Sequence, residues 1–289
     1  MEPKVPGDSY VAFFGTPISL HTVDHYVLYH NLKTWLPYAR NADIIFAGNS
    51  KTLYGFHIPQ FAKMMEPNRI KFYNLGFQQA EGWGFTKILF DRYDLKPKVL
   101  IINGEEFFPR GPSGFAEYVM EHTRWNAWKS VFEDERAFEL MTLIHKSDFF
   151  PYWMVTGGTR AVFRSLKTGA WHWGFKQDGQ QPVVFDPKAK WEEPPRDWVI
   201  KRAKEFKEYL DARGTQLIIT WIPKEVPANF AEVKAIAETL NVPLVTVAPE
   251  GLFTFDHDHL SWESGRLFTE RLVEKLKNDP VFHKLFMVK

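Results

Sequence analysis

The sequence predicts an α/β fold: a three-layer sandwich built on a five-stranded parallel sheet. Five short apolar runs, bounded by glycine, proline or polar residues, have the pattern of buried strands. Segments with helical periodicity lie between most of them. This alternation favours a parallel sheet that is covered by helices on both faces. The expected strands are Asp43–Gly48, Ile70–Gly76, Lys98–Asn103, Thr215–Trp221 and Pro243–Val247.

The helices of this fold are expected between the strands and at the end of the chain. Gly214 is placed as the glycine that ends one of them, and an aromatic-rich amphipathic helix is expected before the first strand, within His25–Arg40. The other expected helices cover Gly82–Tyr93, Asp197–Arg213, Ala228–Leu240 and Trp262–Lys277.

The alternation breaks between Pro109 and Pro195, which we interpret as an insertion after the third strand. Helices are expected over Gly114–Lys129 and Asp134–Ile144, followed by irregular chain. We therefore predict one domain, residues 1–289, with an N-terminal extension (1–42) and an insertion (109–195). The insertion holds six tryptophans: Trp125, Trp128, Trp153, Trp171, Trp173 and Trp191.

The composition excludes several classes of function. The chain has 289 residues, with 36 basic against 35 acidic side chains, so its net charge of +1 provides no field suited to nucleic acid or an anionic membrane. It contains no cysteine, which excludes disulfides, a thiolate nucleophile, cysteine-ligated zinc and iron–sulfur clusters. We expect no metal and no cofactor. Aromatic residues make up 16% of the chain, and we expect some of these rings to face a ligand.

The N-terminal segment has no expected membrane span. Its longest uncharged run, Ser9–Val23, has 15 residues, whereas a spanning helix needs about 20. The first residues also lack the cationic start and apolar block of a signal peptide. Two interpretations stay open: a cytoplasmic protein, or a chain supplied without its export signal or anchor.

Two features at expected strand ends point to chemistry. Ser50 follows the first strand through Gly48 and opens onto a helix, as a nucleophile or, alternatively, as a helix N-cap. Asp256-His-Asp-His259 precedes the last helix, and an aspartate three residues before a histidine can orient its imidazole. Alone, this tetrad is equally compatible with a solvated loop or a site for a hard metal.

The order of these features resembles the SGNH (GDSL-like) hydrolase superfamily. The four similar blocks are Phe46–Ser50, Asn74–Phe77, Ile102–Phe107 and Asp256–Ser261. Gly265 also resembles the glycine that follows the last of these blocks in that family. The resemblance implies a flavodoxin-like sandwich in which Ser50 is the nucleophile, His259 its base and Asp256 the orienting acid. It also implies an oxyanion hole formed by the backbone N–H groups of Ser50 and Gly76.

Two positions depart from the family pattern. Asn49 stands where aspartate is usual, and Glu105 stands where the family has an asparagine that donates to the oxyanion. An ionised carboxylate cannot donate and repels developing negative charge. We expect Asn103 as the replacement donor, or Glu105 protonated or turned away, and a site tuned away from small-ester hydrolysis.

Members of this superfamily with relaxed blocks acetylate exopolysaccharides and cell-wall polymers. The resemblance therefore implies an O-acetyl esterase or O-acetyltransferase acting on a carbohydrate polymer, with Glu105, Trp171 and Trp173 at the substrate. The alternative for the tryptophan rings is that they pack in the core or within the insertion. The alternative function is a non-catalytic carbohydrate-binding or polysaccharide-assembly protein. The resemblance favours an extracytoplasmic or periplasmic location with membrane-associated partners, while a cytoplasmic location stays open.

Overall fold

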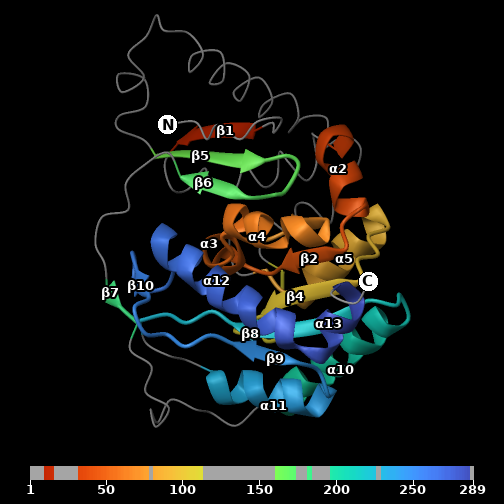
Figure 1. The fold of residues 1–289 in the computed structure, drawn as a ribbon. Coiled ribbons are helices and arrows are strands. Elements are labelled where there is room, and N and C mark those ends of the chain that lie inside the picture. The colour runs from red at the N-terminus through yellow and green to blue at the C-terminus, as the bar shows by residue number, and fades with distance from the viewer. Residues whose placement is uncertain are drawn as a thin grey trace, which may run out of the picture.

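The computed structural model confirms the predicted fold class. It describes residues 10–15, 32–77, 81–112, 160–173, 181–183, 196–225 and 229–286. Five strands form an all-parallel sheet in the order β3-β2-β4-β8-β9, and each lies within the run that predicted it (Figure 1). Their bounds are Phe72–Asn74 (β3), Ile44–Ala47 (β2), Val99–Asn103 (β4), Gln216–Trp221 (β8) and Leu244–Thr246 (β9).

Helices cover both faces of this sheet (Figure 1). Ile45 and Ala47 of β2 pack in a core with α2, α5, α10 and α11, whereas Ile44 and Phe46 pack in a second core with α4, α12 and α13. Because both faces are buried, the strands are apolar at nearly every position. The helices span Leu32–Arg40 (α2), Ser50–Gly55 (α3), Ile58–Met65 (α4), Trp83–Tyr93 (α5), Asp197–Asp211 (α10), Phe230–Leu240 (α11), Trp262–Asn278 (α12) and Pro280–Phe286 (α13), with a short 3₁₀ turn at Glu66–Asn68.

A second, antiparallel sheet joins the two segments that were expected to lie outside the sandwich. Its order is β1-β5-β6, so the N-terminal extension pairs with the insertion. This pairing joins segments about half the chain apart, which a local sequence pattern does not reveal. Another short antiparallel pair forms between β7 and β10. The bounds are Tyr10–Gly15 (β1), Arg160–Ser165 (β5), Trp171–Trp173 (β6), Gln181–Pro182 (β7) and Phe253–Thr254 (β10).

The turn between β5 and β6 docks on the edge strand β3. The backbone N–H of Asn74 donates to the Thr168 carbonyl (2.8 Å), and the fully buried Arg164 donates from Nη2 to the Asn74 carbonyl (3.0 Å). Gly169 has a φ of +68°, and a Cβ there would lie 2.0 Å from the Asn74 oxygen. The turn therefore requires glycine, and these contacts fix the β5–β6 turn beside the end of β3.

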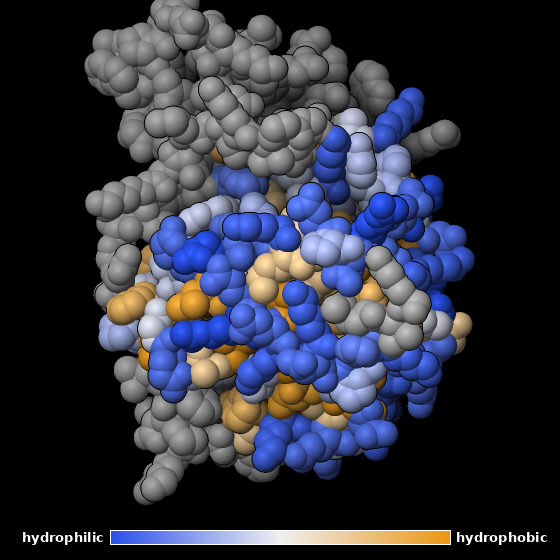
Figure 2. Space-filling view, viewed as in Figure 1, coloured by the Kyte–Doolittle hydropathy of each residue, from blue (hydrophilic) through white to orange (hydrophobic). Residues whose placement is uncertain are grey.

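Other predictions fall partly outside the described residues. The expected helices over 114–129 and 134–144 lie there, as do Trp125, Trp128, Trp153 and Trp191. Within the described residues, α10 ends at Asp211, and Gly214 follows it with a φ of +71°. No described helix is long and apolar enough to cross a membrane. Figure 2 shows the molecule from the side seen in Figure 1, where the described residues at the surface are mostly polar, with small apolar groups between them.

Candidate active site

Ser50 is placed by a tight turn after β2. Gly48 has a φ of +138°, and a Cβ there would lie 2.6 Å from Thr52 Oγ1, so both the backbone and the packing require glycine. The next residue, Asn49, is the N-cap of α3, because its Oδ1 accepts the Lys51 N–H (3.1 Å). Ser50 is then the first residue of the helix and its hydroxyl is left for another partner.

The Asp256–His259 segment folds into a turn around the aspartate side chain. Asp256 Oδ1 accepts the backbone N–H groups of His259 (2.8 Å) and Asp258 (3.2 Å). The Phe255 N–H donates to the His259 carbonyl (3.1 Å) and closes the turn. This geometry brings Asp256 Oδ2 to 2.7 Å from His259 Nδ1. The three-residue spacing thus produces the contact that the sequence predicted.

Ser50 and His259 meet at the carboxyl edge of the sheet. Ser50 Oγ lies 2.8 Å from His259 Nε2. Helix α12 can lie this close to helix α3 because residue 265 is glycine: a Cβ there would lie 2.6 Å from the Tyr54 carbonyl oxygen of α3. The rings of Tyr54 and Phe255 lie 4.4 and 6.0 Å from the imidazole centroid. The three residues predicted to converge therefore form a continuous hydrogen-bonded chain.

The electrostatics of Asp256 suit the orientation of an imidazole. Burial by itself raises the pKa of the Asp256 carboxyl, but the hydrogen bonds and charge of His259 outweigh burial and hold that pKa below its usual range. Asp256 is therefore ionised at neutral pH. A carboxylate on Nδ1 favours the tautomer with its proton there, which turns the Nε2 lone pair toward the Ser50 hydroxyl.

The expected oxyanion donors are only partly available in this conformation. The Gly76 N–H donates to Asn74 Oδ1 (2.8 Å), so it is not free for a substrate. Asn103 Oδ1 accepts the Ile222 N–H (3.0 Å). Its Nδ2 is buried and has no hydrogen-bond partner within the described part of the chain. Asn103 thus keeps an uncommitted donor, whereas Gly76 gains one only if Asn74 rotates.

Two of the residues expected at the substrate, Glu105 and Trp171, are buried in this structure. Glu105 is 1% exposed, and its carboxylate oxygens lie 2.6 Å from Lys51 Nζ and 2.9 Å from Lys224 Nζ. Trp171 is 2% exposed and packs near Tyr54, with ring centroids 6.5 Å apart, so it has no open face for a sugar. The side chain of Trp173 lies outside the described residues.

Three charged residues beside Ser50 and His259 were not predicted as site residues: Lys51, Lys224 and Asp258. Lys51 and Lys224 both contact Asp258, at 3.0 and 3.7 Å, as well as Glu105. Burial alone lowers the pKa of Lys224, but the charges of Glu105 and Asp258 raise it above its usual value. The two lysines could have been found from their positions, because Lys51 directly follows Ser50 and Lys224 follows β8. Both positions lie at the carboxyl edge of the parallel sheet, where ligand sites form.

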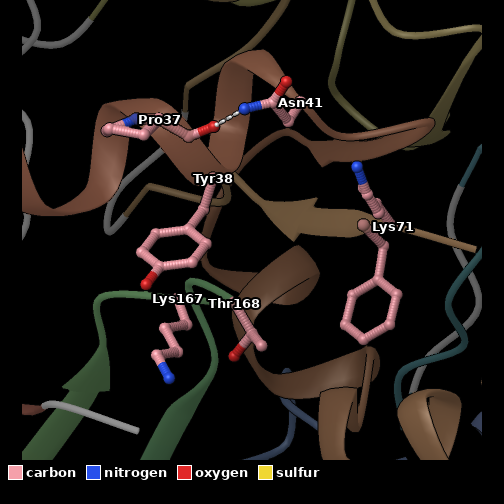
Figure 3. Close-up of a pocket in the computed structure, with 7 residues that line it drawn as sticks. Pro37, Tyr38, Asn41, Lys71, Lys167 and Thr168 are labelled. Atoms are coloured by element: carbon pink, nitrogen blue, oxygen red, sulfur yellow. Dashed lines mark hydrogen bonds between the residues drawn. The ribbon is translucent and has the colours of Figure 1, made fainter.

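A cavity of about 560 Å³ lies away from this chemistry. Tyr38 of α2, Lys71 before β3 and Lys167 after β5 line it (Figure 3). Lys71 precedes its strand, so the cavity lies toward the amino end of β3, while Ser50 follows the carboxyl end of β2. In the part of the chain that the structure describes, no group of three His, Asp or Glu side chains is arranged to hold a metal ion.

Comparison with known proteins finds no matching family model, no matching curated protein and no matching solved structure. The coordinates define the class of protein: an α/β fold with a five-stranded, all-parallel sheet flanked by helices. Within this class, the chain carries a Ser–His–Asp hydrogen-bonded chain at the carboxyl edge.

Proposed function

We propose that this protein is a serine-dependent acyl-ester enzyme of the SGNH type, an O-acetyl esterase or O-acetyltransferase that acts on a carbohydrate polymer. One observation carries the proposal: Ser50 Oγ lies 2.8 Å from His259 Nε2, and His259 Nδ1 lies 2.7 Å from the Asp256 carboxylate. A serine hydroxyl becomes an effective nucleophile when an oriented imidazole accepts its proton. The polymer as substrate rests on the resemblance of the four sequence blocks.

The reaction runs in two half-reactions. His259 Nε2 takes the Ser50 proton while Oγ attacks the ester carbonyl carbon. The imidazolium then gives that proton to the departing alcohol oxygen, which leaves an acyl group on Ser50. Water or a sugar hydroxyl next attacks the acyl carbon and its proton goes to Nε2. The carbon–Oγ bond then breaks as the imidazolium returns a proton to Ser50 Oγ. Asp256 stabilises the imidazolium in both halves.

The oxyanion donors of this proposal are the Ser50 N–H and Asn103 Nδ2. Gly76 joins them only if the Asn74 side chain releases its N–H, because that hydrogen bond is already made in the free protein. One missing oxyanion donor typically costs ~10²–10³ in turnover. The proposal therefore expects slow hydrolysis of small esters and faster reaction with a substrate that reorganises Asn74.

Labelling of the full chain with a fluorophosphonate tests this function. The probe forms a covalent adduct with an activated serine, and peptide mapping identifies the residue. We expect one adduct, on Ser50, and none in Ser50→Ala. A folded wild-type chain that shows no adduct on Ser50 would refute the proposal.

A second candidate, a non-catalytic carbohydrate-binding protein on the same scaffold, has one observation in its favour. Glu105 replaces the expected donor, and the Gly76 N–H is engaged with Asn74, so no complete oxyanion hole is preformed. It is supported if the wild type is inert toward the fluorophosphonate and toward p-nitrophenyl acetate yet binds an acetylated polysaccharide. Labelling of Ser50 excludes it.

A further inference from the structure

A network of four charged side chains lies next to the hydrogen-bonded chain of Ser50, His259 and Asp256. The two lysines, Lys51 and Lys224, alternate with the two carboxylates, Glu105 and Asp258, and each lysine contacts both carboxylates. The side chains of Lys51 and Glu105 are 3% and 1% exposed. Ion pairs buried this deeply contribute little net stability, so their presence beside a reactive serine calls for another explanation.

Asp258 is the member of the network that reaches the triad. Its side chain is 47% exposed, and its Oδ2 lies 4.0 Å from His259 Nε2. This separation is too long for a hydrogen bond. It is short enough that two neighbouring hydroxyl groups of one molecule can each lie about 2.8 Å from one of these two atoms. Asp258 therefore borders the space through which an incoming nucleophile reaches Nε2.

The lysines keep Asp258 in this position as an ion. Burial alone raises the pKa of the Asp258 carboxyl, but the charges of Lys51, His259 and Lys224 outweigh burial and hold that pKa below its usual range. A carboxylate without these partners would pair with the imidazolium that forms during the reaction. Glu105, which neither faces solvent nor contacts the triad, anchors the two lysines.

We propose that Asp258 binds the acyl acceptor and selects a compound with neighbouring hydroxyl groups, such as a sugar or another polyol. This inference rests on the proposed function. The Asp258 carboxylate accepts a hydrogen bond from one hydroxyl, and the adjacent hydroxyl then points toward His259 Nε2. The second oxygen attacks the acyl carbon, its proton passes to Nε2, the carbon–Oγ bond breaks, and Ser50 regains its proton from the imidazolium.

The test measures how the acyl group is partitioned between acceptors. The full chain is given p-nitrophenyl acetate together with equal concentrations of 1,2-propanediol and 1-propanol, and the acetylated products and free acetate are quantified. The wild type should favour the diol. Asp258→Ala should reduce the diol-to-alcohol product ratio about tenfold, the effect of losing one charge-assisted hydrogen bond. Asp258→Asn, which keeps the shape and an acceptor oxygen, should give an intermediate ratio.

A product ratio reports acceptor selection and does not depend on the fraction of the protein that is active. Asp211→Ala, which removes an exposed carboxylate of α10, should leave the ratio at the wild-type value. An unchanged ratio in Asp258→Ala, with Ser50 still labelled by the fluorophosphonate, would overturn this inference and leave the proposed function standing. A wild type whose Ser50 cannot be labelled would refute both.

Discussion

The two ends of helix α3 show opposite ways of placing an ionisable group in the core. At its N-terminal end, Lys51 is buried as an ion between two carboxylates. Just beyond its C-terminal end, His57 is also buried, but burial lowers its pKa to about 4 and keeps it neutral at physiological pH. His57 acts through its neutral form, because its Nδ1 accepts the Gln60 N–H (3.0 Å) and caps α4.

The difference lies in the partners of each group. A buried charge is tolerated only when opposite charges and hydrogen bonds replace the water that it loses. Lys51 has both carboxylates within 3.0 Å. The Nε2 of His57, in contrast, has no hydrogen-bond partner within the described residues, and the His57 ring packs against the Trp262 ring, with centroids 4.2 Å apart. The charged end is also the end that carries Ser50.

Replacing Glu105, the buried carboxylate that contacts Lys51 and Lys224, should have the largest effect on the free energy of unfolding. Glu105→Gln keeps the length of the side chain but leaves Lys51 and Lys224 without their shared buried carboxylate. Breaking a buried ion pair on one side typically costs 3–5 kcal/mol, so we expect a loss of about that size in the free energy of unfolding, measured by urea denaturation.

The neighbouring residue supplies a matched control. Glu106 makes an exposed ion pair with Arg110, and Glu106→Gln should cost less than ~1 kcal/mol. Equal stability of the two variants would contradict the account of the charged end.

The neutral end should make stability depend on pH. Because the pKa of His57 falls from 6.5 in the unfolded chain to about 4 in the folded chain, the unfolded state binds more protons between these values. Stability is therefore lost as the pH falls through this window, by about 3 kcal/mol from this group. His57→Asn keeps a capping side chain that does not titrate, so it should lose correspondingly less stability between pH 7 and pH 4.

Urea denaturation across this pH range provides the measurement. His283→Asn, which removes an exposed histidine of α13, is the matched variant. If the wild type and His57→Asn lose the same free energy of unfolding on acidification, burial does not lower the pKa of His57 in the folded protein.

The sequence was informative where the determinants are local. The five strands follow from short apolar runs, and the contact of Asp256 with His259 follows from a three-residue spacing that the turn itself enforces. The position of Ser50 follows from Gly48, whose positive φ ends β2. These features need only a few consecutive residues, and each was predicted.

The sequence was less informative where distant segments converge. Glu105 resembled a substrate or oxyanion position, and nothing near it in the chain indicates that Lys51 and Lys224 reach it from two other strand ends. The pairing of β1 with β5 and the burial of Trp171 also depend on packing between remote segments. Asp258 stood inside the recognised motif, yet its contacts come from the same two lysines.

The central claim is that Ser50, His259 and Asp256 act as one unit, and the coupling between His259 and Asp256 tests it most directly. The rate constant for fluorophosphonate labelling of Ser50 is measured in the wild type, His259→Ala, Asp256→Ala and the double variant. Because Asp256 acts only through His259, the double variant should be as slow as His259→Ala, with losses of the order of 10³-fold or more. If instead the two losses multiply in the double variant, Asp256 acts independently of His259 and the unit does not exist.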